Sequence, residues 1–248
     1  MNLPINKIIQ GDCLVEMPKI PDKSIDMILC DLPYGTTACS WDTIIPFEPL
    51  WEQYKRIIKD KGAIVLTASQ PFTSALVMSN IKMFKYELIW HKSIPSGNMC
   101  AKTQPMKNHE NILIFGKGKT KYNPQMEKRS ENTHKTGKGG LYKVKSEHLK
   151  NFVAIRKEPN ILRYPTSVRS INNVARHNSL HPTQKPVALF EYLIKTYTNE
   201  GDIVLDNCIG SGTTAVACKR LKRNFIGIEI SEKYCKIARQ RLRQKTLL

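Results

Sequence analysis

The pentapeptide Asp31-Leu32-Pro33-Tyr34-Gly35 brings together a carboxylate, a backbone carbonyl and an aromatic ring, directly after an apolar run at residues 25–30. The short apolar run predicts a buried strand, and the proline and glycine predict a turn where that strand ends. In open α/β sheets, ligands bind at the carboxyl ends of the parallel strands. Because Asp, Pro and Gly are also common in ordinary turns, this stretch alone fits a binding site and a simple strand end about equally.

A second candidate site follows the apolar residues 203–205, which end on Asp206. Gly210 and Gly212 lie between this predicted strand and a predicted helix, where glycines let the backbone approach a ligand at the helix N-terminus. We expect that a side chain at position 212 would block this approach. Glu229 ends the next strand about 20 residues further on, the offset at which an acid binds ribose hydroxyls in nucleotide-binding folds. The pattern also satisfies G-x-G-x-x-A, so NAD binding is an alternative.

Strands and helices alternate along most of the chain, which predicts an α/β fold with a doubly wound, mostly parallel sheet. Strands are expected at residues 7–10, 25–30, 63–68, 84–90, 112–115, 203–206 and 225–229, and helices at 48–61, 71–77, 186–197 and 213–221. Only one strand-helix-strand unit and a final helix follow Leu205, so the cofactor half comes last in the sequence. This order indicates a permuted Rossmann-like fold and disfavours an NAD dehydrogenase. The basic residues of the final helix are expected to form a solvated face.

The net charge of +18 and the pI near 9.6 favour a polyanionic partner such as nucleic acid. Residues 117–157 hold twelve basic residues against three acidic ones, so half of the net charge lies in this segment. The periodicity fades between residues 117 and 180, which predicts a loop-rich insertion between a catalytic half, 1–116, and a cofactor half, 181–248. The candidate nucleic-acid-binding residues are Lys121, Arg129, Lys138, Lys143, Lys145 and Lys150.

Other bulk features limit the class of protein. No apolar run approaches the ~20 residues that cross a bilayer, and the N-terminus lacks the long apolar region of a secretory signal, so we expect a cytoplasmic protein with no membrane partner. The seven cysteines form no C-x-x-C pair, which favours reduced thiols and argues against a structural metal.

Four motifs together resemble the S-adenosylmethionine (SAM)-dependent DNA amino-methyltransferases, in the group whose catalytic motif precedes its cofactor motif. Residues 31–34 resemble the family's Asp-Pro-Pro-Tyr, and residues 206–214 resemble its Asp-Pro-Phe-x-Gly-Ser-Gly-Thr-Thr. Residues 181–186 match its His-Pro-Thr-Gln-Lys-Pro, and Asp12 and Glu229 also fit the pattern. The chain departs from the family at Leu32, which replaces a proline, and at Asn207-Cys208, which replaces Pro-Phe and removes an aromatic ring near the cofactor.

The resemblance implies SAM as the cofactor, double-stranded DNA as the partner and no metal. The implied catalytic residues are Asp31, Leu32, Pro33 and Tyr34, and the implied cofactor-binding residues are Asp12, Cys13, Thr183, Lys185, Asp206, Gly210, Gly212, Thr213 and Glu229. The Asp31 carboxylate and the Leu32 carbonyl would accept hydrogen bonds from the target amine, and the ring of Tyr34 would stack on a base flipped out of the duplex.

We therefore predict a site-specific DNA adenine-N6 methyltransferase in which the basic insertion recognises the target. Cytosine-N4 methylation uses the same chemistry and stays an alternative, as do RNA or protein-amide methylation and a non-catalytic nucleic-acid-binding protein on the same fold. The sequence leaves open whether the protein forms a homodimer or acts with a companion restriction endonuclease.

Overall fold

A computed structural model describes residues 3–37, 39, 42–128, 140–146, 149–156, 161–174, 180 and 184–244, and between 140 and 156 it describes the backbone only. The chain divides into two compact units. The larger unit comprises Met1–Asn123 and Ser167–Leu248, and the smaller one comprises Pro124–Thr166.

The larger unit is built on an eight-stranded sheet with the order β1-β12-β11-β2-β3-β5-β4-β10. Its strands are β1 (Lys7–Gln10), β2 (Ile25–Asp31), β3 (Ile58–Ala68), β4 (Phe84–Ser96), β5 (Lys107–Phe115), β10 (Val168–Ser170), β11 (Ile203–Asp206) and β12 (Asn224–Glu229). Strands β11 and β12 come from the end of the chain and lie between β1 and β2, which come from its beginning. This insertion of late strands between early ones is the permuted order that the sequence predicts.

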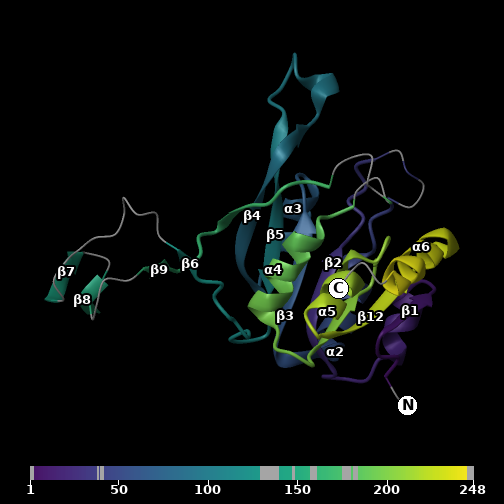
Figure 1. Ribbon diagram of the computed structural model, residues 1–248, viewed down its shortest axis with the longest axis horizontal. Helices are drawn as coiled ribbons and strands as arrows, with labels where there is room; N and C mark the ends of the chain where they lie inside the picture. The colour runs from purple at the N-terminus through teal and green to yellow at the C-terminus, as the bar shows by residue number, and fades with distance from the viewer. Residues whose placement is uncertain are drawn as a thin grey trace. The chain divides into compact units, whose positions relative to one another are not determined.

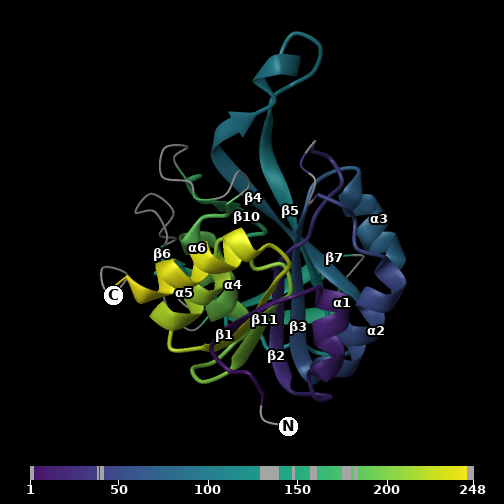
Figure 2. The ribbon, with the colours of Figure 1, turned by 90° about the vertical axis from the view of Figure 1, so that its right-hand side faces the viewer.

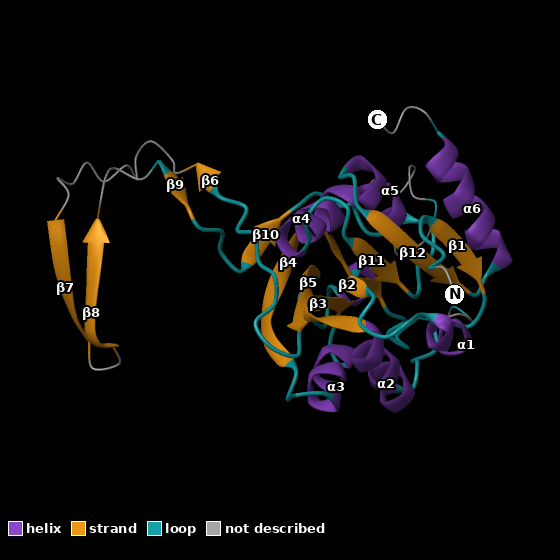
Figure 3. Ribbon diagram, turned by 90° about the horizontal axis from the view of Figure 1, so that it is seen from below, coloured by secondary structure: helices purple, strands orange, loops and turns teal. Residues whose placement is uncertain are grey.

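Helices cover both faces of the sheet, as Figure 3 shows. The helices are α1 (Cys13–Glu16), α2 (Phe47–Ile57), α3 (Phe72–Ser79), α4 (Val187–Tyr197), α5 (Thr213–Arg220) and α6 (Glu232–Arg243), with short 3₁₀ turns η1 (Met17–Lys19) and η2 (Asn98–Cys100). Helices α1, α2 and α3 pack into one hydrophobic core, whereas α4, α5 and α6 pack into a second core on the other face. The expected doubly wound α/β fold is confirmed.

The alternation of side chains along the central strand explains why both faces need a helical cover. In β2, Ile28 and Cys30 belong to the first core, while Met27 and Leu29 belong to the second. All four side chains are fully buried. Successive side chains of a strand point to opposite faces, so a strand that is apolar throughout is stable only between two layers.

Some predicted element bounds need correction, and one strand of the mostly parallel sheet runs antiparallel. The helix expected to run to residue 61 ends at Ile57, because Ile58 already pairs with Ile25 in the sheet and is fully buried. Strand β5 runs antiparallel to both β3 and β4, so the sheet is mixed at this end. Strands β4 and β5 are also longer than expected and form a hairpin that projects beyond the sheet, as Figures 1 and 2 show.

The smaller unit contains two antiparallel strand pairs. Strand β6 (Glu127–Lys128) pairs with β9 (Leu162–Arg163), and β7 (Gly140–Ser146) pairs with β8 (Leu149–Arg156). The unit lies within the basic segment that the sequence singles out, although the predicted division of the chain at 117 and 180 stays a prediction. Within the part of the chain that the structure describes, no helix has the length and apolarity that a membrane span requires.

Candidate active site

The predicted site residues from distant parts of the sequence end up along one edge of the sheet. Gln10, the last residue of β1, pairs with Glu229, and Asp206 pairs with Gly227 of the neighbouring strand. On the other side of β11, Asp31 ends β2 opposite Thr67 of β3. Because β1, β12, β11, β2 and β3 are all parallel, their carboxyl ends form a single edge, which carries Asp31, Asp206 and Glu229.

The Asp31 carboxylate is held by three side chains. The Lys185 ammonium donates to both carboxylate oxygens at 2.7 Å, and the Tyr34 hydroxyl donates to Oδ1 at 2.8 Å. The Thr67 hydroxyl also donates to Oδ1. Asp31 keeps 21% of its side-chain surface exposed, so it is braced from the protein side and open to the solvent side.

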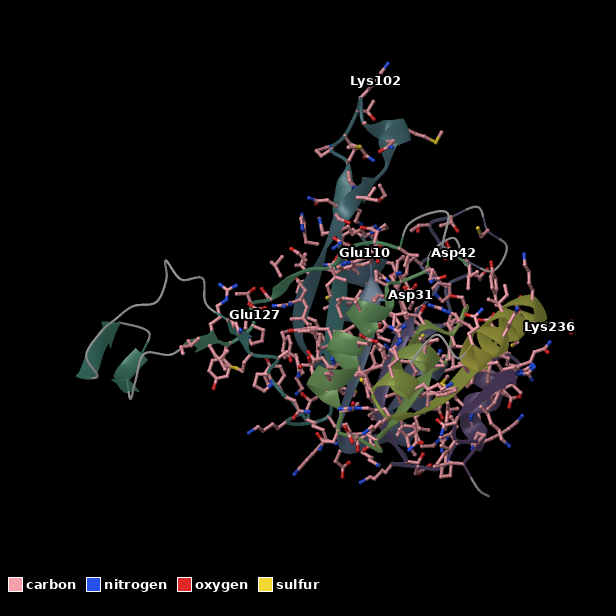
Figure 4. All side chains as sticks on the ribbon, viewed as in Figure 1. Asp31, Asp42, Lys102, Glu110, Glu127 and Lys236 are labelled. Atoms are coloured by element: carbon pink, nitrogen blue, oxygen red, sulfur yellow. The ribbon has the colours of Figure 1, made fainter. Side chains whose placement is uncertain are left out.

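Asp31 and three further charged side chains form a row that alternates in sign. Lys185 contacts Glu110 Oε2 at 3.3 Å as well as Asp31, and Glu110 in turn forms an ion pair with Lys92. Burial alone would lower the pKa of Lys185, but the charges of Asp31 and Glu110 outweigh burial and raise it. Lys185 is therefore a buried, protonated ammonium between two carboxylates, and Figure 4 shows Asp31 and Glu110 at the same end of the molecule.

Tyr34 is fixed by contacts to its ring and to its hydroxyl. The ring stacks on Phe72 with centroids 5.2 Å apart and planes 26° apart, and the Lys185 ammonium lies 5.6 Å from the ring centroid. Burial, followed by the charge of Asp31, raises the pKa of the phenol, so the hydroxyl stays protonated and donates to Asp31. The sequence predicts a role for the Tyr34 ring alone, and the structure adds the hydrogen bond from its hydroxyl to Asp31.

The turn after Tyr34 is organised by Asp42, a residue that no motif in the sequence singles out. Its carboxylate accepts the backbone N–H groups of Gly35, Thr36 and Thr37 at 2.7–2.9 Å. Burial would raise the pKa of Asp42, but these hydrogen bonds, together with one from the Thr37 hydroxyl, lower it. Gly35 has φ +66°, a left-handed conformation that favours glycine. Leu32 buries its side chain in the core, so position 32 can offer only backbone groups to a ligand.

Glu229 is held from behind by backbone amides. Its Oε2 accepts the N–H of Gly210 at 2.9 Å and its Oε1 accepts the N–H of Ser231 at 2.8 Å. Burial raises the pKa of this carboxyl, while the amides of Ser231, Gly210 and Ile230 lower it by a smaller amount. Three amides leave at least one of the roughly four lone-pair sites of a carboxylate for another donor. Glu229 therefore fits the role of acceptor for a ribose hydroxyl.

Asp206 occupies the neighbouring strand end and has no basic partner among the contacts that the structure defines. It accepts the backbone N–H of Cys208 at 3.1 Å and the hydroxyl of Thr214. Burial raises its pKa to about 7, although both hydrogen bonds oppose this shift. The carboxyl group is therefore part protonated near neutral pH.

Gly212 is required for packing, whether or not it also lets the cofactor approach, as the sequence predicts. It has φ +84°, and a Cβ built there would lie 2.9 Å from the Cβ and 3.2 Å from the Cα of Ala238 in α6. A side chain at 212 would thus collide with a helix. Gly210 has φ +50° in the same turn.

Arg241 of α6 braces the same turn, so the predicted solvated basic face of the final helix is wrong for this residue. Arg241 is buried, and its Nη1 donates to the carbonyl of Ser211 at 3.1 Å and lies 3.3 Å from the Thr213 hydroxyl. The Thr213 hydroxyl also donates to the backbone carbonyl of Lys185 at 3.4 Å. Thr213, at the start of α5, therefore contacts the backbone of Lys185, whose side chain contacts Asp31.

Asp12 and Cys13 lie at the start of α1, directly after β1. The Asp12 side chain accepts the N–H of Leu14 at 2.8 Å and caps the helix, while Gly11 N–H donates to the Glu229 carbonyl at 3.0 Å. Asp12 and Glu229 are thus brought to neighbouring strand ends. Of the three residues that depart from the family pattern, Asn207 is buried and accepts the Tyr54 hydroxyl at 2.6 Å, so its side chain serves the core.

The remaining predicted residues divide into two groups. Lys121 forms an ion pair with Asp202, which lies just before β11 and therefore at the edge of the sheet opposite Asp206. This position does not support a contact of Lys121 with DNA at the catalytic edge. The other predictions lie outside the described residues or side chains, namely Thr183, Arg129, Lys138, Lys143, Lys145 and Lys150. In the described part of the chain, no cluster of three or more His, Cys, Asp or Glu residues could hold a metal.

Comparison with known proteins identifies the family. Residues 25–240 match the DNA methylase family that groups N6 and N4 enzymes. The chain belongs to this family. Over 254 residues it is 31% identical to the DNA adenine methyltransferase YhdJ of Escherichia coli (strain K12), with 95% of this chain and 82% of that protein covered.

Solved structures agree with this assignment. The M1.HpyAVI–SAM complex superposes on this DNA methylase with a TM-score of 0.63 at 25% identity, covering 96% of this chain and 99% of that one. The cytosine-N4-specific PvuII DNA methyltransferase shares the fold, with a TM-score of 0.68 at 15% identity and 96% and 86% of the two chains covered. The predicted family, methyltransferase activity and SAM cofactor are confirmed, and the NAD dehydrogenase and non-catalytic alternatives are excluded.

The packing of Gly212 in this DNA methylase leads to a stability prediction. Gly212→Ala should destabilise the fold by about 1–3 kcal/mol, because the new Cβ meets Ala238 and the residue has a left-handed backbone. Urea unfolding of the cofactor-free protein measures this change. The double variant Gly212→Ala/Ala238→Gly should be more stable than the sum of the two single changes in unfolding free energy predicts, because removing the Ala238 Cβ relieves the collision. Strictly additive changes would contradict the packing argument.

The position of Glu229 leads to a prediction about cofactor binding. Glu229→Gln should weaken SAM binding by roughly 1–3 kcal/mol, because an amide accepts a ribose hydroxyl less strongly than a carboxylate does. Calorimetric titration with SAM measures the change. Glu232→Gln is the matched control. Glu232 is an exposed acid at the start of α6, just after β12, and it pairs with Lys236. Equal affinities in the two variants would remove Glu229 from the cofactor site.

Proposed function

We propose that this DNA methylase transfers the methyl group of SAM to the N6 amine of adenine in duplex DNA, and that Asp31 accepts a hydrogen bond from that amine. The observation that carries the proposal is the Asp31 carboxylate, which Lys185 holds through both oxygens on the same sheet edge as Glu229 and the glycine turn. An Asp at the head of the catalytic motif favours adenine in this family. The relative YhdJ, named a DNA adenine methyltransferase, supports the same base.

The chemistry requires acceptors rather than a strong base. SAM supplies an electrophilic methyl group when it is bound. The exocyclic amine of adenine is a poor nucleophile, because its lone pair is delocalised into the ring. Hydrogen bonds from its two N–H groups to the Asp31 carboxylate and the Leu32 carbonyl favour a pyramidal nitrogen and strengthen as positive charge develops there. The site is then complementary to the transition state rather than to the planar base.

Counting acceptor sites assigns the two oxygens of Asp31 different roles. Oδ1 already accepts from Tyr34, Thr67 and Lys185, which exceeds the two lone pairs of one oxygen. Oδ2 accepts from Lys185 alone among the described contacts. We therefore assign Oδ2 as the oxygen that receives the target amine.

The Tyr34 ring is placed to receive a flipped base. Phe72 packs against the ring from the protein side, and the hydroxyl is tied to Asp31, so the ring orientation is fixed before the base arrives. Base–aromatic stacking contributes roughly 1–3 kcal/mol per base in single-strand binders. Pro33 stiffens the turn between the carboxylate and the ring.

The cofactor would lie along β1, β12 and β11. We assign Glu229 to the ribose hydroxyls and Asp12 with Cys13 to the adenine end. Asp206, Gly210, Gly212, Thr213 and Thr183 belong to the methionine end in this assignment. The path follows the order of the strand ends from Asp12 to Asp206, which leads towards Asp31 on the next strand.

We further propose that the basic segment 117–180 recognises the target sequence. Its excess of positive charge suits the phosphates of duplex DNA, whose contacts make affinity dependent on salt. The homodimer and the companion restriction endonuclease stay predictions from the sequence.

The role of Asp31 is tested by Asp31→Ala. Turnover should fall by at least about 10²–10³-fold, because an acceptor that strengthens in the transition state is removed. Affinity for SAM and for DNA should largely survive. Transfer of labelled methyl groups to duplex DNA, with hydrolysis to identify the base, measures both turnover and the choice between adenine and cytosine.

Asp26→Ala is the matched control for Asp31→Ala. Asp26 lies at the other end of the same strand and is also chelated by one lysine, Lys59, at 2.8 Å to both oxygens. The control should lose stability but keep turnover. Near-normal methylation by Asp31→Ala would refute the assignment.

The role of the basic segment is tested by changing Lys143, Lys145 and Lys150 together to Gln. DNA affinity should fall, and the slope of log K against log salt should become shallower by about 0.9 for each phosphate that the variant no longer neutralises. SAM affinity should not change. Lys7, Lys23 and Lys61, exposed lysines of the larger unit, form the matched triple control. An equal salt slope in both triple variants would place the DNA surface elsewhere.

A further inference from the structure

The Lys185 ammonium lies between two carboxylates. A lysine ammonium has three donors. Two of them reach the oxygens of Asp31 at 2.7 Å, and the Glu110 carboxylate lies on the remaining side at 3.3 Å. The family motif implies that Lys185 binds the cofactor, but its side chain is directed to the catalytic carboxylate instead.

Glu110 fixes Lys185 from behind. Glu110 lies on β5 and keeps 13% of its side-chain surface, and its partner Lys92 on β4 keeps 10%. Glu110 Oε2 is buried and makes no hydrogen bond, so its compensation is the charge of Lys185. The ammoniums of Lys92 and Lys185 thus neutralise the carboxylates of Glu110 and Asp31 in a largely buried row of charges. A buried charge without its partner is strongly destabilising, so such a row is stable only when complete.

The backbone of Lys185 belongs to the other half of the site. Its carbonyl accepts the Thr213 hydroxyl at the start of α5, and Thr213 itself contacts Arg241. Lys185 therefore connects the glycine turn, through its backbone, to Asp31, through its side chain.

We propose that Lys185, held by Glu110, is a positioning residue of the methyl-transfer reaction that keeps the Asp31 carboxylate oriented towards the target amine. This inference rests on the proposed role of Asp31. A carboxylate that chelates one ammonium through both oxygens cannot rotate freely, so Oδ2 keeps a fixed direction. Several other titratable groups face this cluster, namely Tyr34, Cys30, Asp206, Lys92 and Lys107.

The test is Lys185→Ala, with exogenous ethylammonium as a chemical replacement for the missing side chain. We expect kcat to fall by about 10²-fold, as for other disruptions of catalytic orientation, while the calorimetric Kd for SAM stays unchanged. Ethylammonium should restore kcat in a saturable way, whereas ethanol should not. Glu110→Gln should lower kcat in the same direction, again without a change in SAM affinity.

Lys59→Ala is the matched control, because Lys59 chelates Asp26 on the same strand with the same bidentate geometry. It should keep kcat and show no response to ethylammonium. If Lys185→Ala does not fold, Lys185→Met retains the apolar stem. Its kcat should then fall as expected for Lys185→Ala, with an unchanged calorimetric Kd for SAM, because the apolar stem cannot orient the Asp31 carboxylate.

Two outcomes would overturn the inference. A loss of SAM affinity that matches the loss of kcat, with no rescue by ethylammonium, would make Lys185 a cofactor ligand. A normal kcat in Lys185→Met would show that the ammonium does not position Asp31. Both outcomes are compatible with an inactive Asp31→Ala and leave the proposed function standing, whereas an active Asp31→Ala would remove the proposed function itself.

Discussion

The site at the sheet edge depends on one electrostatic constraint: the carboxyl group of Asp31 ends a buried strand, is held by a lysine, and still keeps part of its surface exposed. Ionised carboxylates are costly to bury without a partner. Here Lys185 supplies the partner, Glu110 compensates the lysine, and Lys92 compensates Glu110. Each buried charge needs an opposite charge beside it. The row that begins at Asp31 on β2 therefore includes Glu110 on β5 and Lys92 on β4.

The two carboxyl groups at neighbouring strand ends show how environment divides their roles. Asp31 has a chelating ammonium, whereas the described contacts of Asp206 are with the Thr214 hydroxyl, the Cys208 amide and the Cys30 thiol, and burial raises the pKa of Asp206 to about 7. Carboxyl groups whose surroundings differ in this way can act side by side as a charged and a part-protonated group. The proximity of two full negative charges is thereby avoided at an edge that must also accommodate Glu229.

The sequence predicts what local patterns control and misses what only the fold brings together. Apolar runs, the glycine turn and the order of the motifs were sufficient for the permuted sheet and for its reactive edge. Glu110 was missed because its partner Lys185 lies 75 positions away, with no local spacing to connect them. Arg241 could have been found, since Cys235, Ala238 and Arg241 recur at intervals of three on the buried side of α6. The end of α2 was misjudged because strand pairing at Ile58 outweighs helical spacing.

Because the order of the chain is permuted, Lys185 connects two parts of the sheet edge that come from opposite ends of the sequence. The catalytic strand β2 belongs to the first half of the chain, and the glycine turn after β11 belongs to the last, so the two must be aligned by contacts between halves. Adjacent pairing of β11 with β2 fixes their distance, as in Leu205 opposite Ile28. The loop before α4 adds a second connection, because the carbonyl of Lys185 contacts Thr213 while its ammonium contacts Asp31. Lys185 therefore links the start of α5 to the Asp31 carboxylate in addition to the pairing of β11 with β2.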